Sequence, residues 1–299
     1  MRVLFCALAA CLAASPASAD LKIFACEPEW GALAQELGGD KVDVYVATSA
    51  KQDPHHIEAR PSLIARARAA DMVVCTGAEL EVGWLPAVQR QSANRKIQPG
   101  APGDFEAASF VRMLDVPSRV DRADGDVHGA GNPHIQTDPR NIAKVAQGLA
   151  TRFVLLDAAN GAYYEARHNA FDAKWRAALA RWEVTAAPLR GKPIAVQHAN
   201  WPYLNDWLGL KQVVSLEPKP GVPPSAGYLS EVVARVRATP VAFVIRAPHE
   251  NSRPSDFLAA QVAVPAVLLP FTVGGTPQAT DLFALFDDTI ARLLAASSR

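Results

Sequence analysis

Beyond the first 19 residues, short apolar runs alternate with segments whose apolar residues recur at helical spacing. The runs at 21–25 and 72–75 are typical of buried strands, whereas 29–37 and 61–69 carry a period near 3.6 residues. Strands that alternate with helices of this length form βαβ units, which place the strands in a parallel sheet. The first half of the chain therefore predicts an α/β lobe.

The same alternation returns after residue 188 and predicts a second lobe of similar architecture. Its segments are strand-like runs at 193–197, 212–216, 241–245 and 266–269 and helical patterns at 230–237, 253–260 and 281–295.

Between these halves, residues 139–183 carry no strand signal. Asn160-Gly161 divides the stretch, and a helix over 162–186 is long enough to cross a lobe of about 35 Å. We therefore expect an α/β fold of two Rossmann-like lobes with parallel sheets, joined by one long backbone helix. The expected parts are a signal peptide at 1–19, an N-terminal lobe at 20–140, a helical connection at 141–188 and a C-terminal lobe at 189–299.

The N-terminus has the pattern of a secretory signal peptide. Arg2 precedes an apolar stretch at 3–14, and the small residues at 17–19 form a cleavage site before Asp20. The stretch is too short to span a hydrocarbon core of roughly 30 Å. We expect a secreted, periplasmic protein. The alternative is lipid attachment at Cys11, which follows Leu-Ala-Ala.

Charge and cysteine content narrow the function. The chain has 30 basic and 30 acidic side chains, and this balance argues against a nucleic-acid partner, which requires a concentrated basic face. Of four cysteines, only Cys26 and Cys75 lie beyond the predicted signal peptide. In an oxidising compartment we expect them to form a disulfide, provided that the strands they follow are neighbours. Otherwise they are two separate buried thiols.

All seven histidines follow the predicted signal peptide. His168 lies in the long helix, and we place the others in loops that follow strands, where open α/β sheets bind their ligands. A single histidine is more often structural than a ligand, but His55, His134 and His198 occupy matching positions. Proline precedes the first two and lowers the entropy cost of ordering a binding site.

Three segments resemble motifs of one family, the metal-binding receptors of ATP-driven zinc and manganese importers that have a rigid helix between their lobes. The resemblance covers essentially the whole chain after residue 19, in order and spacing. The segments are DPHHIEARPS (53–62), NPHIQTDPRN (132–141) and VQHANWPYLNDWLGL (196–210).

By that resemblance, the metal ligands are His55, His134 and His198. The acid that commonly supplies the family's fourth ligand is missing from residues 268–272. We expect Asp281, beyond the following glycine-containing loop, to replace it. The alternatives for this position are His249, Glu250 and a water molecule.

Three imidazoles with one carboxylate or water form a nitrogen-rich, four-coordinate set that suits Zn²⁺. Mn²⁺ prefers oxygen ligands, so histidine rather than glutamate at position 198 favours zinc, whereas copper and nickel stay open on affinity alone. Acid is expected to release the ion by protonating the histidines. The loop at 121–131 carries Asp121, Asp124, Asp126 and His128, which either collect metal weakly and pass it to His134 or are simply solvated.

We therefore expect a high-affinity extracytoplasmic Zn²⁺-binding protein that delivers the ion to the permease of an ABC-type importer in the inner membrane. A monomer is expected, with a periplasmic metallochaperone as a second candidate partner and no enzymatic activity. One alternative is a receptor for an organic metal chelate or haem. Another is a zinc hydrolase with Glu58 or Glu250 as general base, although the chain has no His-Glu-x-x-His motif.

Overall fold

The structure is a computed structural model that describes residues 20–121 and 125–298. The predicted signal peptide, with Cys11, lies outside the described residues. Within the described ranges, no helix combines the length and the apolar character that crossing a bilayer requires.

The N-terminal lobe is built on a sheet of four parallel strands in the order β2-β1-β3-β4. Apolar residues run continuously through β1 and β3 because helices cover both faces of the sheet. Alternate residues of these strands pack on α1 from one side and on α2 and α3 from the other. The bounds are β1 (Leu21–Ala25), α1 (Pro28–Gly38), β2 (Val42–Val46), α2 (Pro61–Ala69), β3 (Met72–Cys75), α3 (Leu85–Ser92) and β4 (Asp104–Glu106).

The C-terminal lobe repeats this topology with four parallel strands in the order β6-β5-β7-β8. Helices α7 and α8 cover one face of the sheet, and α6 and α9 pack into the core on the other. The bounds are β5 (Pro193–Val196), α6 (Pro202–Leu208), β6 (Lys211–Ser215), α7 (Ala226–Ala238), β7 (Phe243–Arg246), α8 (Arg253–Val262), β8 (Ala266–Leu268) and α9 (Leu282–Ser297).

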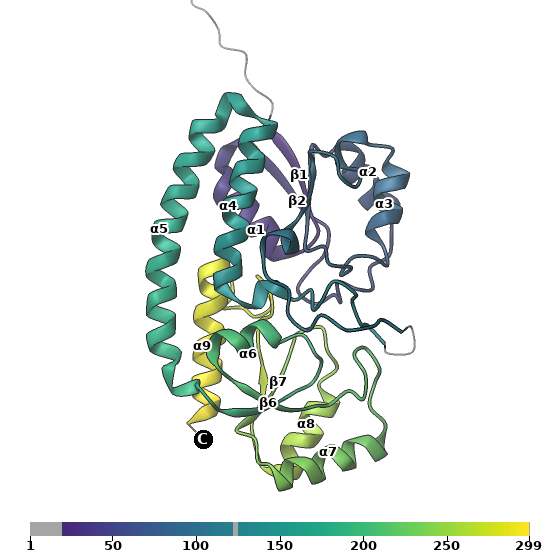
Figure 1. Cartoon of the computed structure of the whole chain (residues 1–299), viewed down its shortest axis with the longest axis vertical. Helices are drawn as coiled ribbons and strands as arrows, with labels where there is room; N and C mark the ends of the chain where they lie inside the picture. Colours follow the sequence, from purple (N-terminus) through teal and green to yellow (C-terminus); the bar gives the residue numbers. More distant parts are fainter. Residues whose placement is uncertain (1–19, 122–124, 299) are drawn as a thin grey trace, which may run out of the picture.

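Two helices, α4 (Pro139–Leu156) and α5 (Gly161–Ala186), connect the lobes, and the predicted long backbone helix is confirmed as α5. Its 26 residues extend for about 39 Å and run alongside both lobes (Figure 1). Trp175 of α5 stacks on Phe171 and meets Phe283 of α9 at a ring-centroid distance of 4.9 Å. The helix also contacts α1, so it packs against an element of each lobe.

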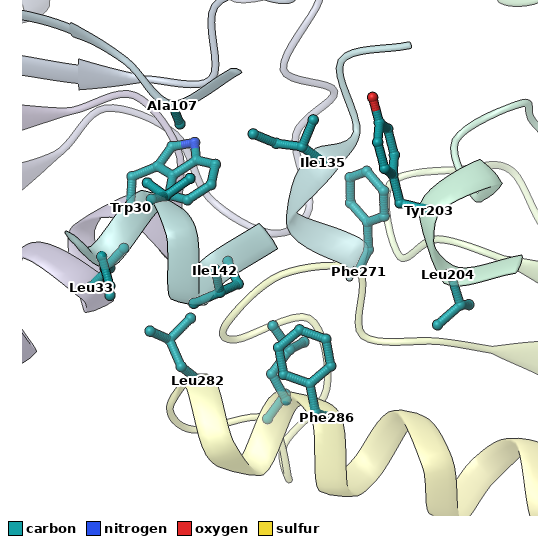
Figure 2. Close-up of a cluster of buried hydrophobic side chains, with 14 of the residues drawn as sticks. Trp30, Leu33, Ala107, Ile135, Ile142, Tyr203, Leu204, Phe271, Leu282 and Phe286 are labelled. Carbon is teal, nitrogen blue, oxygen red and sulfur yellow. The ribbon is translucent and has the colours of Figure 1, made fainter. Parts of the chain in front are cut away.

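A single apolar core continues from one lobe into the other. One cluster of buried side chains combines residues from α1, α4 and α9 (Figure 2). Its members include Trp30 and Leu33 of α1, Ile142 of α4, and Leu282 and Phe286 of α9. Side chains so closely packed resist relative movement, because separating them exposes apolar surface to water. The two lobes are therefore held together by a shared core. A cavity lies where they face each other.

The predicted disulfide between Cys26 and Cys75 is confirmed. Cys26 follows β1 and Cys75 ends β3, and these neighbouring parallel strands bring the two Cα atoms to 4.8 Å. Two elements of this lobe, helix α3 and strand β4, were not predicted. Strand β4 lies within 99–131, where the sequence shows little periodicity, because a three-residue strand is too short to carry a pattern.

Three carboxylic acids are buried beside this disulfide: Glu27, Glu29 and Glu81. Glu81 accepts hydrogen bonds from the backbone N–H groups of Thr76 and Gly77 at 2.7 and 3.1 Å. Burial raises the pKa of Glu29 and of Glu81 to about 7, and burial together with the neighbouring acids raises the pKa of Glu27 well above its usual value. We call these three residues the acid cluster.

Glu29 of the acid cluster also joins the two lobes, because its carboxyl accepts a hydrogen bond from the Thr272 hydroxyl of the C-terminal lobe.

Candidate metal centre

His55 and His134 are held by the same local arrangement. In each case an Asp or Asn two residues earlier, across a proline, accepts hydrogen bonds from both the backbone N–H and the ring Nδ1 of the histidine. Asp53 Oδ1 lies 3.0 Å from the backbone nitrogen of His55 and 2.8 Å from its ring Nδ1. Asn132 Oδ1 lies 3.1 and 2.8 Å from the corresponding atoms of His134. Because the side-chain oxygens take the Nδ1 protons, the Nε2 lone pairs are left available for a metal.

His198 is anchored by a residue from a neighbouring strand. It follows β5, and its Nδ1 lies 2.7 Å from Oε2 of Glu217, which follows the adjacent strand β6. The same carboxylate oxygen accepts a hydrogen bond from the backbone of Gly221 at 2.9 Å, which fixes its position. His198 therefore also directs Nε2 away from its anchor, as a metal ligand does.

These three histidines come together around one cavity of about 670 Å³ between the lobes. Their ring centroids are 5.4 Å apart for His55 and His134, 6.2 Å for His55 and His198, and 5.9 Å for His134 and His198. Nitrogens that share one Zn²⁺ lie about 3.3 Å apart. No three histidine nitrogens in residues 20–121 and 125–298 all come within 4.8 Å of one another, so the rings have to converge further to share one ion.

Burial and neighbouring charges set the protonation of these side chains. Burial lowers the pKa of His134 well below its usual value, and the other histidines add to that effect. Burial also opposes the charge on His198, but its contact with Glu217 outweighs this and raises the pKa. Burial would raise the pKa of Asp53, yet hydrogen bonds from His55 hold it well below the usual range. The cavity thus combines neutral imidazole with fixed negative charge.

His128 of the 121–131 loop joins the cluster. Its Nε2 lies 3.2 Å from Nε2 of His55, close to the separation of two nitrogens on one Zn²⁺, and the two rings stack at 5.2 Å. Two backbone N–H groups tie residues 125–131 of the loop to both lobes: that of Gly129 donates to the Glu79 carboxylate at 2.6 Å, and that of Asp126 donates to the Pro220 carbonyl at 3.0 Å.

The sequence interpretation left His128 as either a weak metal collector or a solvated residue, since a histidine in a glycine- and aspartate-rich loop carries no positional signal. Asp124, which was grouped with it, lies outside the described residues.

The structure does not bring Asp281 to the histidines, and we correct that expectation. Asp281 is exposed, and its Oδ1 accepts a hydrogen bond from the backbone N–H of Ala284 at 2.8 Å. It is the N-cap of α9, a position for which aspartate is strongly preferred.

The two other protein alternatives for the fourth position lie beside the cavity. Both carboxyl oxygens of Glu250 are engaged, by Asn200 Nδ2 at 2.9 Å and by the backbone N–H of Ala247 at 3.1 Å. His249 packs against Phe271, with ring centroids 5.4 Å apart, and Phe271 in turn lies 5.7 Å from His134. His249 thus lies next to the cluster, and Phe271 contacts both its ring and that of His134.

Both lobes of this α/β chain contribute histidines to one cavity between them. This arrangement defines a receptor for a small ligand that binds nitrogen donors. The family model of ZnuA, "Zinc-uptake complex component A periplasmic", matches residues 23–296. The chain belongs to this family.

Individual relatives agree with this assignment. The chain is 24% identical over 239 residues to a high-affinity zinc uptake system protein ZnuA of Bacillus subtilis, covering 79% of this chain and 73% of that protein. It is 25% identical over 307 residues to the ZnuA of Paracoccus denitrificans, covering 89% of each. A crystal structure of ZnuA superimposes with a TM-score of 0.78 at 22% identity, over 93% of this chain and 99% of that one, and so shares the fold.

Proposed function

We propose that this protein captures Zn²⁺ outside the cytoplasm and presents it to the permease of an ABC-type importer. The observation that carries the proposal is the shared orientation of His55, His134 and His198, each with Nδ1 held by an oxygen acceptor and Nε2 left for a metal. The family is named for a zinc-uptake component, a transport role, and its zinc-uptake relatives fit the same function. We place the protein in the periplasm, as a monomer.

We further propose that His128 completes the site. Four imidazole nitrogens form a tetrahedral set that favours Zn²⁺ over Mn²⁺, which seeks oxygen ligands. The ion brings two positive charges into a buried place, and the carboxylates of Asp53 and Glu217 supply two negative charges one hydrogen bond away. This balance reduces the cost of burying the ion, because an unpaired charge in a low-dielectric site is expensive.

The hydrolase alternative gains no support from the family match, because the matched family is named for a zinc-uptake component.

Competition titration with a chromophoric chelator tests the proposal. Residues 20–299, stripped of metal, are titrated with Zn²⁺, Mn²⁺, Cu²⁺ and Ni²⁺ as the parent and as His198→Ala, His128→Ala and Asp281→Ala. We expect one tight Zn²⁺ per chain and a loss of about a hundredfold or more in His198→Ala, which corresponds to about 2.7 kcal/mol.

The matched variants assign the fourth ligand. His128→Ala is expected to weaken Zn²⁺ binding, and Asp281→Ala to leave it unchanged, because Asp281 caps α9. Zinc binding no tighter than micromolar, or a His198→Ala variant equal to the parent, would refute the site. If Asp281→Ala weakens Zn²⁺ binding and His128→Ala does not, His128 is not a ligand of the site.

A further inference from the structure

His249 differs from the three anchored histidines in one respect. Its Nδ1 is buried and has no hydrogen-bond partner among the residues that the structure describes, whereas Nδ1 of His55, His134 and His198 is held by an oxygen. A buried polar atom without a partner is costly and calls for an explanation. The missing anchor also means that the ring is held by packing alone and can turn.

The loop that carries His249 is nevertheless fixed beside the metal centre. Two hydrogen bonds clamp it to the loop of His198: Gln197 Nε2 donates to the Asn251 carbonyl at 2.7 Å, and Asn200 Nδ2 donates to Glu250 Oε1 at 2.9 Å. The loops follow the adjacent parallel strands β5 and β7. The backbone of His249 therefore stays at a constant distance from His198 while its ring retains freedom.

His249 also lies on the wall of the cavity that His55, His134 and His198 line, and this cavity is far larger than one metal ion. Phe271 contacts both its ring and that of His134. His249 is thus a further nitrogen donor on the wall of the cavity whose proposed site already has four. An ion held by four nitrogens exchanges slowly unless an incoming donor forms a bond while another breaks, because each bond broken without replacement raises the barrier.

We propose that His249 is an exchange ligand: a nitrogen that bonds the metal transiently while it enters or leaves the site of His55, His128, His134 and His198. This inference rests on the proposed zinc-binding function. The metal–nitrogen bond to His249 forms as the bond to His128 breaks, so the ion keeps its coordination number and its charge compensation throughout the step. The anchored histidines set the affinity, and His249 sets the rate.

Stopped-flow transfer of Zn²⁺ between the protein and a fluorescent chelator tests this role. The variants are His249→Phe, which keeps the aromatic contact with Phe271, and His249→Gln, which keeps a polar side chain. His56→Gln is the matched control, because His56 lines the same cavity but is largely exposed. We expect loading and release both to slow by about tenfold in the His249 variants, a barrier change of about 1.4 kcal/mol, with Kd changed less than threefold.

The other outcomes overturn the role. Unchanged or faster exchange means that His249 takes no part, and a Kd weakened as strongly as in His128→Ala means that it is a permanent ligand. Equal slowing in His56→Gln means a general effect of cavity histidines. Thermal unfolding of the metal-free variants verifies folding. Failure of the proposed function looks different, because the parent protein itself then does not bind Zn²⁺ tightly.

Discussion

Two groups of buried titratable side chains lie within this molecule, and they differ in how their polar atoms are satisfied. In the histidine cavity, one nitrogen of each anchored ring has a fixed partner and the other is left for a ligand. In the acid cluster, Glu81 accepts from two backbone N–H groups, Glu29 accepts from Thr272 and Glu27 Oε2 accepts from Thr76, whereas Glu27 Oε1 has no partner among the described residues. The histidine cavity thus leaves an Nε2 on each of three anchored rings for a ligand, whereas most oxygens of the acid cluster already accept from the protein, a difference that burial alone does not reveal.

In the metal-free protein, two histidines of the cavity, His128 and His249, respond to pH oppositely to two members of the acid cluster. Burial raises the pKa of Glu29 and Glu81 from 4.5 to about 7, so the stability that they contribute is complete below pH 4.5 and is lost as the pH rises through about 7. Burial lowers the pKa of His128 and His249 from 6.5 to about 4, so their contribution is complete above pH 6.5 and is lost as the pH falls towards 4.

Removal of the disulfide has the largest expected effect and acts on the acid cluster alone. The double variant Cys26→Ala/Cys75→Ala releases a cross-link between residues separated by 49 positions. We expect the free energy of unfolding in urea to fall by about 3–4 kcal/mol, with Zn²⁺ affinity changed less than threefold. A large loss of affinity with retained stability would contradict the separation of the two groups.

The next effect is confined to the histidine cavity. Glu217→Gln keeps an oxygen for His198 Nδ1 but removes the negative charge that balances the ion. We expect Zn²⁺ affinity to fall by about 10–100-fold in the chelator titration, because residues that orient a ligand contribute on that scale. Glu231→Gln, on the exposed surface of α7, is the control. Equal affinities in the two variants would mean that Glu217 does not support the site.

Much of this arrangement was predictable from the sequence, and the successes share a cause. The α/β alternation and the long helix were read from hydrophobic periodicity, which records burial directly. The role of His55 and His134 as ligands stays a prediction, but their local Asx-Pro-His motifs hold both rings through hydrogen bonds between residues only two positions apart. The disulfide was expected on the condition that the strands before Cys26 and Cys75 are neighbours, and the structure meets that condition.

The failures concern contacts that no local pattern encodes. Glu217 meets His198 across 19 residues because β5 and β6 are adjacent, and nothing in the surrounding sequence marks it. We chose Asp281 because the acid that commonly supplies the family's fourth ligand is missing, and that choice passed over the helix-start signal around Asp281 itself. An aspartate directly before an apolar helical run is a strong N-cap signature, and that assignment is the one the structure makes.

The smallest expected effect distinguishes the pH responses of the two groups. Glu29→Gln retains an acceptor for the Thr272 hydroxyl but cannot ionise. Wild-type Glu29 is neutral at pH 5. At pH 8 its carboxyl either ionises without a cationic partner or stays neutral at a cost in free energy.

We therefore expect the variant and the parent to melt at equal temperatures at pH 5. At pH 8 we expect the variant to melt higher, by about 2–4 °C for each kcal/mol of desolvation cost that the buried carboxyl no longer incurs. Zn²⁺ affinity should not change, since the substitution leaves the histidines and their anchors untouched. Glu36→Gln, a half-buried side chain of the same helix, is the control. A variant less stable than the parent at pH 8 would mean that Glu29 is ionised and stabilised there, and the opposition between acid cluster and histidine cavity would then be lost.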